Sequence, residues 1–169
     1  ADMWSLNNRL PQLYERIGGR LQPASYSSSP WASAPSPGGN LRGPVRQLGR
    51  FLEVLLRRGK MTDGRAFVSE STVELMTTIH RRGQYDQTLQ HVIDFGLGVI
   101  RDSKDYGPDT VPYGFGRLCS QASFGHGGSQ CSMGFVDPER ELVVAWAANA
   151  FCGEPQHQRR NRMINDAIY

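Results

Sequence analysis

The sequence predicts an α+β fold in which helices flank an antiparallel β-sheet. Two strand-like runs, Ser132 to Val136 and Leu142 to Ala147, flank an Asp-Pro-Glu-Arg turn, a pattern typical of a β-hairpin. Apolar residues recur at helical spacing between Val45 and Leu56. The length of 169 residues fits one domain of ordinary size that can bury a core.

The segment from Phe124 to Ser129 precedes the hairpin and is rich in glycine. Gly125, Gly127 and Gly128 have no side chains, so a ligand can approach the backbone of this strand closely from one side. The segment therefore predicts a ligand-facing strand.

Composition excludes two kinds of partner. The net charge of +3 is small and the arginines are scattered along the chain, so we expect no nucleic acid partner. No apolar run approaches the roughly 20 residues that span a bilayer, so we expect no membrane span. The first residues lack a signal-peptide pattern and the chain does not begin with Met, so we expect a mature or cut product whose compartment stays open.

No metal or cofactor is expected. The cysteines are odd in number and lack zinc-ligand spacing, which indicates free thiols at Cys119, Cys131 and Cys152. Cys131 is expected to be a small packed side chain rather than a reactive thiol. Three histidines are dispersed and are expected at the surface: His80, His91 and His157.

The N-terminal quarter gives weak signals. Pro11 and the pair Gly18-Gly19 limit any helix between Asn7 and Leu21 to a short one, and a strand pair turning at Gly18-Gly19 fits as well. Residues 22–43 are rich in Ser, Pro and Gly and indicate a loop. This loop is either a plain linker or the border of a cleft, with Gly38 and Gly39 in its tight turn.

Two helices are expected in residues 44–80, and both are expected to be structural. Pro44 suits the first turn of the first helix, and Gly59 can take the left-handed conformation that ends it. Ser69 is expected to cap the second helix, whose apolar residues extend from Val73 to Ile79.

Strands and a final helix follow. Asp94 to Arg101 predicts one strand by its alternation and Tyr113 to Leu118 predicts another, so residues 93–149 hold about four antiparallel strands. A helix over residues 155–169 should cover one face of the sheet. Its apolar face carries Met163, Ile164, Ala167 and Ile168.

Several short motifs follow one another from about Leu10 to Asn149. They are Gly38-Gly39, Leu48-Gly49-Arg50-Phe51-Leu52 with Gly59-Lys60, Val68 to Thr78, Phe95-Gly96-Leu97-Gly98, and Gly125-His126-Gly127-Gly128 with Gly134 to Glu139. Their order resembles serine β-lactamase-like hydrolases, in particular the group of class C β-lactamases, esterases and D,D-peptidases. The resemblance implies the C-terminal part of the β-lactamase/transpeptidase-like fold, which is also that of penicillin-binding proteins.

The resemblance implies covalent catalysis, in which an activated serine attacks the carbonyl of a small acyl substrate. Such chemistry needs a Ser-x-x-Lys turn, a Tyr-x-Asn loop or its equivalent, and a Lys-Thr-Gly or His-x-Gly strand. His126-Gly127-Gly128 matches the strand, and by the same match the backbone N–H of Ser129 would donate to the oxyanion. A lone histidine is usually a polar surface residue, and this setting favours a site role for His126.

The nucleophile and its base are missing from the sequence. The residues three before Lys60 and Lys104 are arginines rather than serines, and no tyrosine is followed two positions later by asparagine. Three serines near the strand lack a nucleophile elbow and are expected to form hydrogen bonds: Ser123, Ser129 and Ser132. We therefore expect residues 1–169 to be a single partial domain, with a loop-rich entry segment over residues 1–43, that is inactive alone.

Two function classes stay open. The first is the C-terminal fragment of an enzyme that hydrolyses an ester, an amide or a β-lactam when its N-terminal half is present. The second is a non-catalytic module whose cleft binds a ligand or a partner protein. A half-fold would leave a sheet edge and an apolar face uncovered, so we expect association with the missing half or with a second copy.

Overall fold

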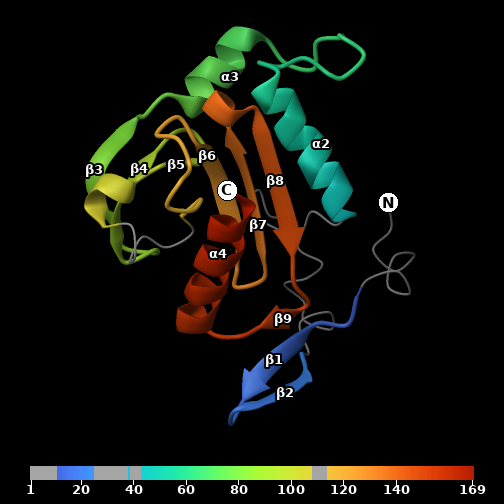
Figure 1. Ribbon diagram of the computed structural model, residues 1–169, viewed down its shortest axis with the longest axis vertical. Coiled ribbons are helices and arrows are strands. Elements are labelled where there is room, and N and C mark those ends of the chain that lie inside the picture. The colour runs from blue at the N-terminus through green and yellow to red at the C-terminus, as the bar shows by residue number, and fades with distance from the viewer. Residues whose placement is uncertain (1–10, 25–37, 39–42, 108–113) are drawn as a thin grey trace.

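A computed structural model describes residues 11–24, 38, 43–107 and 114–169 of the chain. The main sheet has six strands: β3 (Arg81–Asp86), β4 (His91–Phe95), β5 (Ile100–Arg101), β6 (Phe124–Gly128), β7 (Ser132–Asp137) and β8 (Leu142–Ala147). Each strand pairs antiparallel with the next along the chain. Helices cover parts of both faces (Figure 1), so the α+β fold class is confirmed, although four strands was too low a number.

The predicted hairpin has the longest run of paired residues in the main sheet. β7 and β8 pair from Ser132 opposite Ala147 to Asp137 opposite Leu142. The turn between them is a short 3₁₀ helix, η5 (Pro138–Arg140), followed by Glu141 in the left-handed conformation. The Asp-Pro-Glu-Arg signal therefore predicted both strands and the turn correctly.

The prediction of a single strand over Asp94 to Arg101 was wrong. The chain reverses between β4 and β5, where the Gly96 N–H donates to the Val99 carbonyl oxygen at 2.9 Å and Gly98 has a φ of +75°. A Cβ at Gly96 would lie 2.2 Å from the Met76 carbonyl oxygen. Glycine is thus required at this turn, and the alternating pattern concealed the turn.

The strand predicted over Tyr113 to Leu118 was also wrong for its described residues, 114–118; Tyr113 lies outside them. Phe115 is buried and stacks on Phe135 of β7, with ring centroids 5.1 Å apart. The apolar residues of this segment therefore fill the core from a loop. The sequence instead missed β3, because Arg-Arg-Gly-Gln-Tyr-Asp shows no alternation of apolar and polar residues.

The two predicted helices are confirmed as α2 (Val45–Leu56) and α3 (Glu70–Thr77). The Ser69 hydroxyl accepts a hydrogen bond from the Thr72 N–H at 3.1 Å and caps α3. Leu52 and Leu55 of α2 share a buried cluster with Val136 of β7. The last turn of α2 ends through two residues with positive φ: Arg58, at +53°, takes the position that glycine usually holds, and Gly59 follows at +92°.

The C-terminal helix, α4 (Glu154–Ile168), lies in front of the main sheet in Figure 1, and its Asn165 side chain accepts a hydrogen bond from the Trp146 indole N–H of β8. Its predicted apolar face was wrong. Met163 is 63% exposed and Ile168 40% exposed, and the buried residues are polar: His157, Asn161 and Asn165. Asn161 and Asn165 donate to the Gly114 carbonyl oxygen at 3.0 and 2.9 Å. The helix therefore docks through hydrogen bonds to a loop, which apolar periodicity does not reveal.

The first described segment forms a small second sheet. β1 (Tyr14–Ile17) and β2 (Arg20–Pro23) pair antiparallel around Gly18-Gly19, which is the strand-pair alternative of the sequence prediction. β1 also pairs in parallel with β9 (Ala150–Phe151), which follows β8. Most of the predicted loop over residues 22–43 lies outside the described residues.

Candidate active-site strand

β6 carries the predicted His-Gly-Gly motif between two unequal neighbours. On one side all five of its residues pair with β7, from Phe124 opposite Val136 to Gly128 opposite Ser132. On the other side β5 pairs with Phe124 and Gly125 alone. Within the described ranges no strand pairs with His126, Gly127 or Gly128 on the β5 side. An extended ligand could add to the sheet at this end of β6.

Gly125 and Gly128 of β6 differ in how strictly their surroundings require glycine. A Cβ at Gly125 would lie 2.2 Å from the Gly134 carbonyl oxygen and 2.6 Å from the Phe135 Cα, so packing against β7 requires glycine there. A Cβ at Gly128 would lie 2.2 Å from the Ser132 hydroxyl oxygen, which is the end of a side chain that can rotate. Close approach of a ligand is therefore not needed to explain Gly125.

His126 has an exposed side chain at the middle of β6. Its Nδ1 lies 2.7 Å from the Gly127 carbonyl oxygen, and because a carbonyl only accepts, Nδ1 carries the hydrogen of this bond. The His126 and Phe95 ring centroids are 6.3 Å apart, and the Arg81 guanidinium lies 4.4 Å from the Phe95 centroid. No local sequence pattern predicts Phe95 beside the histidine or Arg81 over the Phe95 ring, because Phe95 belongs to β4 and Arg81 to β3.

Ser129 is exposed and lies just beyond the end of β6. A tight turn follows, in which the Cys131 N–H donates to the Gly128 carbonyl oxygen at 3.2 Å and Gln130 has a φ of +54°. The Ser129 N–H thus belongs to the turn that joins β6 to β7. Ser123 and Ser132 lie elsewhere: Ser123 is buried, with its N–H donating to Ser120, and Ser132 begins β7.

The glycines predicted at a cleft border are described only in part. Gly38 is an exposed turn residue, and no atom lies within 4 Å of the place a Cβ would take. Gly39 lies outside the described residues. Gly38 is not brought next to β6 by any contact that the structure records, so the role of this loop stays a prediction.

Lys104 is held in a structural cluster. Its ammonium group donates to the Asp102 carboxylate at 2.8 Å and to the Cys119 carbonyl oxygen at 2.6 Å. Burial alone would lower the pKa of Lys104, but the bonds to Asp102 and Cys119 outweigh burial and raise the pKa above 10.5. A lysine that stays protonated is a poor general base.

The remaining histidines and cysteines do not form a metal or nucleophile site. No group of three or more potential ligands that could hold a metal occurs in the part of the chain that the structure describes. His80 is exposed and His91 half-buried, but the surface prediction for His157 was wrong, because His157 lies on the buried face of α4. Cys131 is half-buried as expected, and burial raises the pKa of its thiol.

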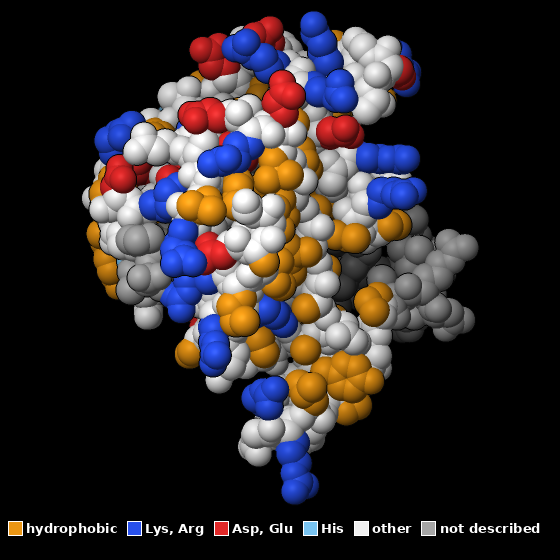
Figure 2. Space-filling model, viewed as in Figure 1, with side chains coloured by type: hydrophobic (Ala, Val, Ile, Leu, Met, Phe, Trp, Pro, Cys, Tyr) orange, Lys and Arg blue, Asp and Glu red, His pale blue; other side chains and the backbone are white. Residues whose placement is uncertain are grey.

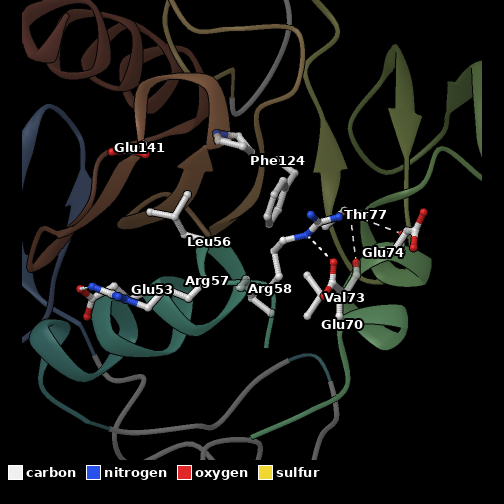
Figure 3. Close-up of a pocket in the computed structure, with 12 residues that line it drawn as sticks. Glu53, Leu56, Arg57, Arg58, Glu70, Val73, Glu74, Thr77, Phe124 and Glu141 are labelled. Carbon is white, nitrogen blue, oxygen red and sulfur yellow. Dashed lines mark hydrogen bonds and ion pairs between the residues drawn. The ribbon is translucent and has the colours of Figure 1, made fainter. Parts of the chain in front are cut away.

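A groove of the described surface lies away from the motif. It runs between α2, α3 and the turn after β7 (Figure 3), and its lining includes Phe124 but not His126, Gly127, Gly128 or Ser129. No described helix is long and apolar enough to cross a membrane. Among the described residues, Gly127 and Gly128 have a neighbouring strand on the β7 side alone.

Comparisons with known proteins agree with the motif order. The family model for beta-lactamase matches residues 5–168. A penicillin-binding protein homolog from Caulobacter crescentus has the same fold, with a TM-score of 0.61 at 22% identity, over 98% of this chain and 46% of that protein. A beta-lactamase from Mycobacterium bovis gives a TM-score of 0.55 at 23% identity, over 70% of this chain and 40% of that protein. No curated protein matches.

The chain thus spans less than half the length of these two structures, whose likeness shows the fold. The resemblance to serine β-lactamase-like hydrolases that the motifs indicated is confirmed by the family match and by the shared fold. Because the match extends over nearly all of its length, the chain belongs to the beta-lactamase family.

Proposed function

We propose that this chain contributes the substrate-binding strand of a serine hydrolase that acts on a β-lactam, an ester or a peptide amide. The observation that carries the proposal is the end of β6: among the described residues, Gly127 and Gly128 pair with β7, and no strand pairs with them on the side of β5. An acyl substrate would lie along this edge, with the Ser129 N–H donating to the oxyanion and His126 beside the reacting carbonyl.

The nucleophile and its base are proposed to come from the N-terminal half of the same fold. Residues 1–169 would then form one partial domain. The sequence has no Ser-x-x-Lys and no Tyr-x-Asn, and Lys104 is held by Asp102 and Cys119. The coverage of 46% and 40% of the two related structures supports a division of this kind.

The proposal predicts that the chain alone is catalytically inactive. We expect no burst and no turnover with nitrocefin or with p-nitrophenyl esters, because no serine of the chain has a base in a recognisable motif. Mass spectrometry of the intact protein after incubation checks this result directly. Acylation of any serine would contradict the proposal.

A non-catalytic binding module is the second candidate, and the missing Ser-x-x-Lys is the observation that favours it. The same open edge of β6 would then hold a ligand or a partner segment without turnover. The coding sequence upstream of this chain separates the two candidates. A Ser-x-x-Lys encoded there in frame supports the hydrolase, and its absence supports the binding module.

A further inference from the structure

A groove of about 670 Å³ lies at the end of the molecule opposite the β6–β7 turn. The end of α2, the length of α3 and the η5 turn form its walls (Figure 3). The apolar part of its lining, here called the floor, consists of Leu55, Leu56, Val73, Phe124 and Pro138. Leu55, Val73 and Phe124 are buried, whereas Leu56 is partly exposed and Pro138 is exposed. The floor therefore offers Leu56 and Pro138 to apolar side chains of a bound segment.

The rim of the groove is charged, with an excess of carboxylates. Two arginines are already paired: Arg58 with Glu70 at 2.9 Å, and Arg57 with Glu53 at 3.7 Å. Two further carboxylates, Glu74 and Glu141, line the groove and form no ion pair with any described residue. Figure 3 shows Glu74 and Glu141 on opposite sides of Leu56 and Phe124. The rim therefore presents a negative charge at each end of the apolar floor.

Arg58 has an unusual backbone conformation at this groove. Its φ of +53° places it in the left-handed region at the end of α2, where glycine is the usual residue. Its side chain extends over Val73 to Glu70 (Figure 3). Unfavourable backbone conformations of this kind are concentrated at binding sites. Arg58 is already paired with Glu70, so the charges that remain for an incoming group are the negative charges of Glu74 and Glu141.

We propose that this groove docks an apolar peptide segment of a partner protein that carries arginine or lysine on both sides of its apolar residues. Charge complementarity selects this occupant, because basic side chains would pair with Glu74 and Glu141 while the apolar residues cover Leu56 and Pro138. An acidic segment would face two unpaired carboxylates. The proposal concerns a surface apart from β6 and does not depend on the proposed hydrolase activity.

The test is a titration of the isotope-labelled chain with a blocked peptide, followed by amide shifts in NMR spectra. The peptide has arginine at both ends and leucine and alanine between, and its twin replaces arginine with glutamate. We expect the basic peptide to shift amides of α2, α3 and η5, and binding to weaken as salt is added. The double substitution Glu74→Gln with Glu141→Gln should weaken binding about tenfold, since two exposed ion pairs are lost.

The matched control is Glu139→Gln, which removes the same charge from exposed η5 but not from the groove lining. It should change the affinity less than about twofold. Equal binding of the acidic twin, equal effects of the control and the double substitution, or shifts confined to other elements would overturn the proposal. Shifts of the groove amides on concentrating the chain without peptide would also overturn it, because a second copy would then be the occupant.

Discussion

His126 and His157 lie in opposite environments. His126 is exposed on β6, whereas His157 is fully buried on the inner face of α4, with its ring centroid 6.3 Å from that of Trp146. Burial, and then the positive charge of Arg160, lower the pKa of His157 from 6.5 to about 4. The sequence did not reveal the burial of His157, because polar residues surround it along the chain and its burial depends on how α4 docks.

The burial of His157 predicts a pH dependence of stability. Between pH 6.5 and about 4 the unfolded chain binds a proton at His157 that the folded chain does not bind. The free energy of unfolding should therefore be highest above this range and decrease by about 3 kcal/mol as the pH falls through it. Urea denaturation at a series of pH values measures the decrease. His157→Gln should reduce it, while His80→Gln, at an exposed histidine, should not.

A second prediction concerns His126 in an acylating assembly that includes the nucleophile-bearing half. His126→Ala should lower the acylation rate about 100-fold, because a group beside the developing charge is lost. The free energy of unfolding should change by less than about 0.5 kcal/mol, since the side chain is exposed. Stopped-flow acylation and denaturation of the same variant compare the two effects.

Ser129→Ala is the matched control for His126, because it keeps the backbone N–H that is proposed to donate to the oxyanion. Its acylation rate should stay within about twofold of the parent, since a surface hydroxyl is all that is removed. Equal losses of activity and stability in His126→Ala would assign His126 a structural role only.

At the scale of elements, α4 is held by hydrogen bonds of buried polar side chains rather than by an apolar face. Asn165 donates to the Gly114 carbonyl oxygen at 2.9 Å and to the Asn161 side-chain oxygen at 3.1 Å, and it accepts from the Trp146 indole N–H at 3.1 Å. Buried groups that are fully paired in this way order the 114–118 loop against the helix. The helix therefore fixes the loop that places Phe115 in the core.

These hydrogen bonds predict that substitutions at two positions of α4 have different effects on stability. Asn165→Ala should destabilise the fold by about 2–3 kcal/mol, because it leaves the Trp146 N–H and the Gly114 carbonyl with fewer partners in a buried site. Met163→Ala should change stability by less than about 0.5 kcal/mol, because Met163 is 63% exposed. Thermal or chemical denaturation of both variants measures the contrast. If Met163→Ala destabilised the fold more than Asn165→Ala, α4 would instead dock through the apolar face that the sequence predicts.

The elements that the sequence predicted correctly have local signals. The Asp-Pro-Glu-Arg turn, the Ser69 cap and the apolar period of α2 each act through residues a few positions apart. The errors come from tertiary contacts. Gly96 is needed because Met76 approaches it, and the polar face of α4 is buried because Gly114 offers a carbonyl. The edge strand β3 has no apolar pattern to detect.

In the candidate site, too, local patterns could be predicted from the sequence and tertiary contacts could not. The His126-Gly127-Gly128 motif was found from its spacing and from the order of its neighbours, and it does lie on a strand. That no described strand pairs with Gly127 and Gly128 on the side of β5 could not be predicted, because it follows from the shortness of β5. Phe95 beside His126 and Arg81 over the Phe95 ring come from separate strands, so no local pattern connects them.

At the scale of the whole molecule, the main sheet ends at β8. No described strand pairs with the outer side of β8, and residues of α2 and β8, including Val143 and Ala145, line a groove of about 600 Å³. Figure 2 shows hydrophobic side chains gathered between α4 and α2, over β7 and β8. Val45, Leu48 and Phe51 of α2 are also more than a third exposed. Open strand edges and broad apolar surfaces favour association.

We therefore predict that this chain associates at micromolar concentration, with the N-terminal half of its fold or with a second copy. Sedimentation velocity should show a mass that rises with concentration. Ala147→Lys, which adds a charge at the exposed end of β8, should shift the chain towards monomer, because charged residues oppose edge-to-edge pairing. Leu118→Lys adds the same charge at an exposed residue of the 114–118 loop and should leave the association unchanged. A compact, stable monomer that binds no hydrophobic dye would contradict both the association and the partial domain from which it is predicted.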